Sequence, residues 1–120
     1  MDVNSSEIKA YVNLDEGMGR VRGNKKLYKR MLGMYLAGKE FEMLETALAE
    51  GNLTAAADVA HAIKGMTGNL SLTAVFNLST QMMMELRTGA YNKELHDSFK
   101  DACEKTTTIL DYVINEHLKD

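Results

Sequence analysis

Apolar residues in this chain recur at intervals of three and four positions along almost its whole length, and they nowhere alternate as they would in a strand. The 120 residues include no proline, and the helix-favouring residues leucine, methionine, alanine, glutamate and lysine are abundant. A chain of this length can bury a hydrophobic core without disulfide bonds. The pattern therefore predicts an all-α fold, organised as a single domain over residues 1–120.

Asparagine and glycine residues mark the expected helix ends. Asn4 and Asn13 are each followed three positions later by a glutamate, which is the capping-box pattern, and Asn24 is a further N-cap candidate. Helical spacing continues on both sides of Gly38, so the segment from Asn24 to Gly51 is either two helices or one kinked helix. The other expected helices cover about 5–13, 14–21, 54–70, 73–88 and 93–118.

The last expected helix carries a continuous seam of mostly apolar side chains. Its members step by four and three positions: Leu95, Phe99, Ala102, Thr106, Ile109 and Val113. Such a seam is typical of a helix that packs nearly antiparallel to its neighbours. We therefore expect an antiparallel four-helix bundle with a short N-terminal helical cap.

Composition argues against several classes of protein. No apolar run approaches the roughly 20 residues of a membrane span, and the N-terminus lacks the apolar core of a signal peptide. The formal net charge of −3 argues against a dedicated nucleic-acid-binding domain. Cys103 is the single cysteine, which excludes a disulfide framework and favours a cytoplasmic protein. No Gly-rich nucleotide loop occurs, so we do not expect an enzyme that binds its own nucleotide.

The expected helix over 54–70 has an unusual surface around His61. At roughly 100° per residue, four apolar positions share one stripe and predict the core side. These positions are Val59, Ile63, Met66 and Leu70. His61 points away from that stripe. The outer face around it carries small residues and one cation, namely Thr54, Ala57, Lys64, Gly65 and Gly68.

Glycine within a helix costs about 1 kcal/mol relative to alanine, so two glycines on one exposed face need a reason. Small neighbours would let another protein bring a reactive group against the imidazole of His61. An exposed imidazole is mostly neutral at pH 7 and is a competent nucleophile. The Lys64 ammonium on the same face would balance the charge of a phosphoryl group. The simpler alternatives are an ordinary surface histidine and a helix that merely ends at Gly68-Asn69.

The stretch from His61 to Ser71 resembles the phosphorylation motif of histidine-containing phosphotransfer (HPt) domains of two-component phosphorelays. The family's pattern is a histidine, an apolar residue, Lys-Gly, small residues, Asn-Leu and a further small residue. The matching positions are His61, Ile63, Lys64, Gly65, Asn69, Leu70 and Ser71.

A second segment upstream is similar to another part of the family's pattern. This segment is GMGRVRGNKKLYKRML over 17–32, and its matching positions are Arg20, Gly23, Asn24, Leu27 and Tyr28. Glu85 resembles the acidic residue that is common near the end of the following helix. The two motifs occur in the family's order, and the resemblance spans roughly 14 to 89.

The resemblance implies a phosphocarrier that is not an enzyme in its own right. His61 would accept a phosphoryl group from a receiver-domain aspartate and pass it to another receiver, with Lys64 stabilising the phosphoryl charge and Asn69 in a supporting role. Together with the helix-face argument, it assigns a docking surface to Ala57, Gly65, Gly68 and Met84. The implied partners are receiver domains of response regulators and a hybrid sensor histidine kinase. The chain would need no cofactor of its own, because the receiver supplies Mg²⁺.

Two alternatives to a phosphocarrier are considered, and the chain differs from the family's motif at one position. A helical-bundle scaffold would dock receivers without phosphotransfer, although such a scaffold would have no need of the nucleophile. Asp58 and His61 form an Asp-x-x-His pattern, but a metal-binding bundle requires more ligands than this, so no metal site is expected. The family often has glycine where this chain has Ser71, and the effect of that departure is left open.

Other notable residues have ordinary explanations. His96 and His117 are expected on the surface of the last helix. Met82 is expected in the core, with Met84 on the opposite side beside Asn77 and Gln81. A basic cluster is interpreted as the solvated side of a helix, with a contribution to the docking rim as the alternative. It comprises Arg20, Arg22, Lys25, Lys26, Lys29 and Arg30.

Overall fold

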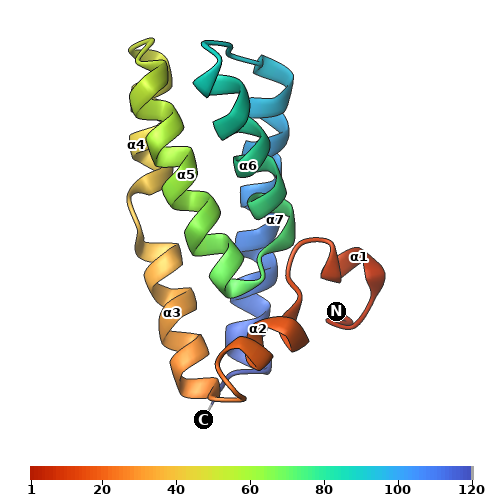
Figure 1. Cartoon of the computed structure of the whole chain (residues 1–120). Coiled ribbons are helices and arrows are strands. Elements are labelled where there is room, and N and C mark those ends of the chain that lie inside the picture. Colours follow the sequence, from red (N-terminus) through yellow and green to blue (C-terminus); the bar gives the residue numbers. More distant parts are fainter. Residues whose placement is uncertain (120) are drawn as a thin grey trace.

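The computed structural model describes residues 1–119, which contain seven α-helices and no strand (Figure 1). The all-α prediction is therefore confirmed. The helices are α1 (Ser6–Lys9), α2 (Leu14–Arg20), α3 (Lys25–Ala37), α4 (Glu40–Ala49), α5 (Leu53–Leu70), α6 (Thr73–Arg87) and α7 (Lys93–Glu116).

The bundle has four corners, and two short helices share one of them (Figure 1). α3 and α4 follow each other along that corner, separated by a break at Gly38-Lys39, so the segment forms two helices. α5, α6 and α7 occupy the other corners, and α5 contacts α6, α4 and α3. α1 and α2 cover one end of the bundle, where α2 contacts α3 and α5. The expected four-helix bundle with an N-terminal cap is confirmed.

Asparagine side chains start four of the helices. The Oδ1 atoms of Asn13, Asn24, Asn52 and Asn92 each accept a hydrogen bond of 3.0–3.1 Å from the backbone N–H three residues later. The predicted Asn4 cap is wrong, because the Ser5 hydroxyl caps α1 instead. α1 is also shorter than expected, at 4 residues. It ends early because the chain turns to bury Val12 in the core.

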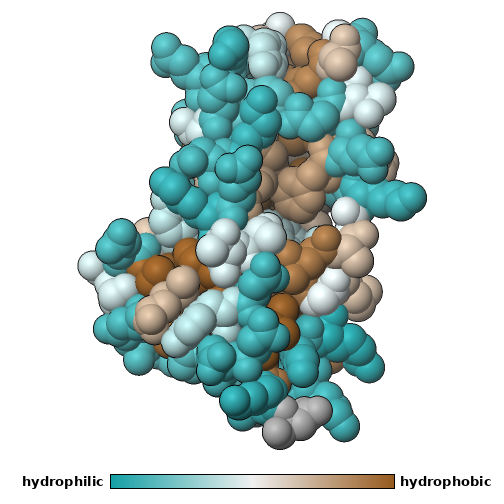
Figure 2. All heavy atoms as spheres, turned by 180° about the vertical axis from the view of Figure 1, so that it is seen from behind, coloured by the Kyte–Doolittle hydropathy of each residue, from teal (hydrophilic) through white to brown (hydrophobic). Residues whose placement is uncertain are grey.

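The core consists of two neighbouring clusters. One lies at the cap end and includes Val12, Tyr28, Leu32 and Leu110. The other lies between α4, α5, α6 and α7. The α7 seam contributes to both clusters, and all six of its predicted positions are buried. Seen from behind, the surface is mainly hydrophilic, with apolar side chains visible in the middle and lower part (Figure 2). Within residues 1–119, no helix combines the length and the apolarity that crossing a membrane would demand.

The buried side of α5 is turned relative to the sequence prediction. Ile63 and Leu70 are buried as expected, but Val59 and Met66 are only half-buried. The buried set is Ala56, Ala57, Ala60, Ile63, Thr67 and Leu70. The predicted placement of Ala57 on the outer docking face is therefore wrong, since its exposed fraction is 3%. Because α5 has neighbours on more than one side, its buried arc is wider than a single stripe.

Candidate functional site

His61 lies on the exposed part of α5, and one edge of its ring faces α6. Its Nδ1 is 3.3 Å from the Sδ of Met83, a buried residue. A thioether sulfur has no proton to donate, so this contact is a hydrogen bond only when Nδ1 carries the ring proton. In that tautomer, the Nε2 lone pair is available as a nucleophile. The contact with α6 therefore orients the ring, and a proton on Nδ1 would leave Nε2 as the unprotonated nitrogen.

A cleft of about 590 Å³ lies beside His61, between α5, α6 and the N-terminal cap. α5 contributes Lys64, Gly65, Thr67, Gly68 and Asn69, while α6 and its approach contribute Leu72, Thr73, Phe76 and Asn77. The cap contributes Lys9, Asn13, Glu16 and Arg20, and Ser71 closes the end of α5. Charged side chains in this lining are three cations, Lys9, Arg20 and Lys64, and one carboxylate, Glu16. The surface beside His61 therefore favours an anionic partner.

The two glycines near His61 differ in their surroundings. A Cβ added to Gly65 would meet no atom within 4 Å, so this position leaves open space next to the imidazole. A Cβ added to Gly68 would lie 3.0 Å from the Phe76 ring, so this glycine also lets α6 pack closely. Gly65 is thus the glycine that leaves clearance beside His61. Gly68 has a packing reason of its own.

The structure distinguishes the remaining candidate residues. Lys64 is half-buried and Asn69 is exposed, and both line the cleft. Met84 is exposed as predicted, at 60%, but it does not belong to the cleft lining. The methionine that contacts His61 is Met83, which the sequence analysis missed. Only the run of three methionines signalled it, and a run cannot indicate which member faces the neighbouring helix.

Ser71 ends α5 in a left-handed backbone conformation with φ of 58°. This explains why glycine suits the position, since a non-glycine residue there costs about 1–2 kcal/mol. The serine side chain offsets part of that cost through two hydrogen bonds. Its Oγ accepts a 3.1 Å bond from Arg20 Nε and donates a 2.9 Å bond to Glu16 Oε1. The backbone carbonyl of Ser71 also accepts a 3.0 Å bond from the Asn13 N–H.

The upstream motif builds the support beneath this helix end. Tyr28 is fully buried, and its hydroxyl donates a 2.7 Å hydrogen bond to the carbonyl of Leu70. Burial, with a smaller contribution from the Glu16 charge, raises the pKa of Tyr28 to about 12. A Cβ at Gly17 would lie 2.6 Å from Tyr28 Cζ, so α2 can cross the tyrosine only through a glycine. Of the basic cluster, Arg20 alone lines the cleft.

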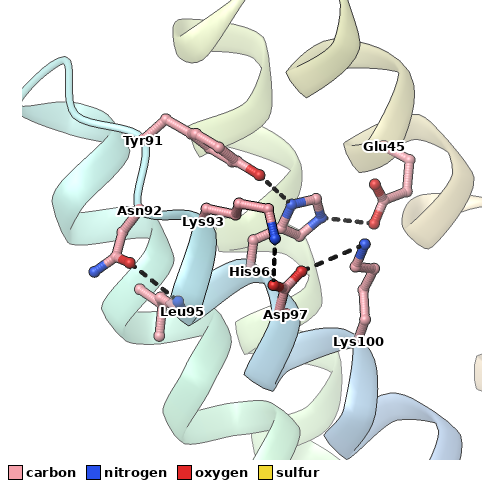
Figure 3. Close-up of polar contacts among 8 residues, drawn as sticks. All are labelled: Glu45, Tyr91, Asn92, Lys93, Leu95, His96, Asp97 and Lys100. Atoms are coloured by element: carbon pink, nitrogen blue, oxygen red, sulfur yellow. Dashed lines mark hydrogen bonds and ion pairs between the residues drawn. The ribbon is translucent and has the colours of Figure 1, made fainter.

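His96 is not the surface residue that the sequence analysis expected. Its exposed fraction is 5%, and it joins α7 to α4 and to the loop before α7 (Figure 3). Its Nε2 lies 2.8 Å from Glu45 Oε1, and its Nδ1 lies 2.7 Å from the Tyr91 hydroxyl. The imidazole flanks the α7 seam and is buried because both of its nitrogens have partners there. His117 is exposed, as predicted.

Residues 1–119 hold no group of three or more His, Cys, Asp or Glu side chains able to bind one metal ion. Asp58 and His61 are both exposed on α5.

A scan against protein-family models matched the Hpt domain model over residues 31–115, well over half of the chain. The matched range contains the whole His61–Ser71 motif, α6 and almost all of α7, whereas most of the upstream motif precedes it. Comparisons with curated proteins and with solved structures gave no match.

Proposed function

The chain belongs to the Hpt domain family, whose members carry out histidine phosphotransfer in two-component signalling, and on this premise we propose that His61 is its phosphoacceptor. In this proposal, a phosphorylated receiver domain docks over α5 and α6 and transfers its phosphoryl group to His61. A second receiver later removes the group. The chain is a carrier between receivers, and its cytoplasmic location stays a prediction from the sequence.

The transfer step follows from the ring orientation. The Nε2 lone pair attacks the phosphorus of the receiver's aspartyl phosphate, the N–P bond forms, and the P–O bond to the aspartate breaks. The aspartate leaves as a carboxylate, and the ring proton stays on Nδ1 beside Met83. Lys64 balances the charge that develops on the phosphoryl oxygens. Mg²⁺ belongs to the receiver, so the chain contributes a nucleophile, a cation and a docking face.

One observation carries the proposal: an exposed imidazole on α5 has its Nδ1 against Met83, while Gly65 leaves the space beside it open. A histidine with only a structural role would have its ring buried among partners, as His96 has. His117 is exposed as well but does not line the cleft, so it is the combination of exposure, the cleft and the open space at Gly65 that favours chemistry at His61.

The proposal is tested by incubating the protein with phosphorylated receiver domains and Mg²⁺ and following acid-labile label. Wild type should gain the label, His61→Gln should not, and His117→Gln, which alters an exposed histidine directly after α7, should behave as wild type. Label on the His61→Gln protein would refute the assignment of the phosphoacceptor. Receiver binding without label on wild type would favour a docking scaffold instead.

A further inference from the structure

We infer that Arg20 is a docking residue for the acidic surface of the receiver and that the Ser71 hydroxyl positions it. This inference rests on the proposed function, because it names the part of the same surface that recognises the partner. It also gives a role to Ser71, which occupies a position where the family often has glycine.

The geometry around Ser71 fixes the Arg20 side chain. Arg20 Nε donates to Ser71 Oγ at 3.1 Å, and its Nη2 lies 3.7 Å from Glu16 Oε1. Nε is engaged at the floor of the cleft and Nη2 forms only a long ion pair with Glu16, so the exposed N–H groups on the Nη edge of the guanidinium can still bind a partner. Half of the Arg20 side chain is exposed, and the residue lines the same cleft as His61. Ser71 is itself buried, so its hydroxyl is a fixed anchor.

The distance from His61 along α5 indicates which side chains can reach the phosphoryl group and which can act only in docking. Lys64 is three residues from His61, about 5 Å along the helix axis, which is within reach of a phosphoryl group on the imidazole. Ser71 is ten residues from His61, about 15 Å along the axis, so a side chain anchored there lies too far for that role. A standard interface covers about 800 Å² per partner, a disc of roughly 16 Å radius. Arg20 therefore belongs to the rim of an interface centred on His61.

Charge complementarity identifies what meets this rim. A receiver that holds Mg²⁺ beside its aspartyl phosphate must present carboxylate ligands around the site, because Mg²⁺ takes oxygen donors. These ligands make the face of the receiver around its phosphoryl group acidic, and Arg20, about 15 Å from His61, meets the outer part of that face rather than the Mg²⁺ ligands themselves. Arg20 can bind a carboxylate through two parallel N–H groups, whereas Glu16 repels one. The two residues therefore have opposite effects on docking.

The experiment follows single-turnover transfer from a phosphorylated receiver at low and high salt, with KM as the half-saturating protein concentration and kcat as the maximal first-order rate constant, together with the unfolding temperature. The variants are Arg20→Gln, Glu16→Gln, Ser71→Gly and the double variant Arg20→Gln/Ser71→Gly. Arg30→Gln is the matched control, because Arg30 is an exposed arginine of α3 outside the cleft.

Arg20→Gln should raise KM about two- to five-fold at low salt with kcat unchanged, and the effect should shrink at high salt. Glu16→Gln should lower KM, because the amide oxygen still accepts from Ser71 while the negative charge is gone. Ser71→Gly should keep or raise the unfolding temperature, because glycine relieves the left-handed backbone, and should still raise KM. In the Arg20→Gln background, Ser71→Gly should add nothing to KM.

The inference is overturned if Arg20→Gln matches Arg30→Gln in KM, or if Ser71→Gly changes KM equally in both backgrounds. A change in kcat alone would also overturn it, because a rim residue does not touch the phosphoryl group. Absence of transfer by the wild type with every receiver tried would refute the proposed function itself, so the two failures are distinguishable.

Discussion

The Tyr28 hydroxyl donates a 2.7 Å hydrogen bond to the backbone carbonyl of Leu70 and so ties α3 to the C-terminal end of α5. The last carbonyls of a helix have no partner within the helix, and this one is buried. The Asn13 N–H also holds this helix end, because it donates a hydrogen bond to the backbone carbonyl of Ser71. The upstream segment thus supports the helix that carries His61 without reaching the imidazole itself.

Replacing Tyr28 by phenylalanine should lower the free energy of unfolding by about 1–3 kcal/mol, because the Leu70 carbonyl is left buried without a partner. Denaturant unfolding measures the change. Tyr112→Phe, at a half-buried tyrosine of α7, is the matched control and should stay within about 0.5 kcal/mol of wild type. Equal losses in the two variants would show that the Leu70 hydrogen bond contributes nothing.

Alkaline pH should weaken the fold through the same residue. Burial raises the pKa of Tyr28 from 10.0 to about 12, so the native state retains a proton that the unfolded chain releases first. Its stabilising contribution is complete below pH 10 and is lost as the pH rises towards 12. Burial also raises the pKa values of Tyr35 and Cys103, so deprotonation of each of the three groups lowers the free energy of unfolding as the pH rises.

Comparison of wild type with Tyr28→Phe isolates the Tyr28 contribution, because Tyr35 and Cys103 are common to both proteins. The free energy of unfolding should fall less steeply in the variant between about pH 10 and about pH 12. Parallel pH profiles would mean that Tyr28 titrates alike in the folded and unfolded chains.

Features that depend on residues close together in the chain could be predicted from the sequence. Asn13 and Asn24 cap helices because each side chain reaches a backbone N–H three residues away, which requires no knowledge of the rest of the fold. The α7 seam is similar, since its spacing alone brings Phe99 and Ile109 to one side. The motif around His61 combined local spacing with a resemblance, and it predicted the family that the model match shows.

Features that depend on a partner far away in the chain could not be predicted from the sequence. His96 is buried through Glu45, which lies 51 residues away, and His61 contacts Met83, 22 residues away. The predicted outer position of Ala57 is wrong because the core side of α5 is wider than a single apolar stripe. The arc that α5 buries depends on where α4 and α6 lie, and periodicity within α5 does not contain that information.

Gly65→Leu should abolish most transfer while the fold is kept. A side chain here meets no neighbour, and leucine favours helix over glycine by up to about 1 kcal/mol, so the unfolding temperature should hold or rise. Obstruction of the approach to His61 should slow transfer by about 10²-fold. Gly33→Leu on α3 is the matched control, because Gly33 is also helical, exposed and free of neighbours. Equal transfer by both variants would show that access to His61 does not depend on a small residue at position 65.

Lys64→Ala should lower the rate of transfer about ten-fold and shorten the lifetime of the phosphohistidine, because one charge that faces the phosphoryl group is lost. The unfolding temperature should change little, since the lysine is only half-buried. Lys26→Ala, on the exposed side of α3, should leave both the rate and the lifetime unchanged. A Lys64→Ala protein with normal kinetics would show that the cation plays no part in the step.

Met83→Leu tests whether α6 selects the reactive nitrogen of His61. Leucine is close to methionine in volume, so the free energy of unfolding should change by less than about 1.5 kcal/mol. Without the sulfur acceptor, the ring proton is no longer held on Nδ1, and a neutral hydrogen bond of about 0.5–1.5 kcal/mol corresponds to a roughly two- to ten-fold loss in transfer rate. Nitrogen NMR of labelled histidine reports the tautomer directly and should show the Nδ1–H form of His61 declining in Met83→Leu but not in Met82→Leu. If the ring-nitrogen signals were the same in all three proteins, the Met83 contact would be mere packing. The choice of Nε2 would then have to come from the receiver.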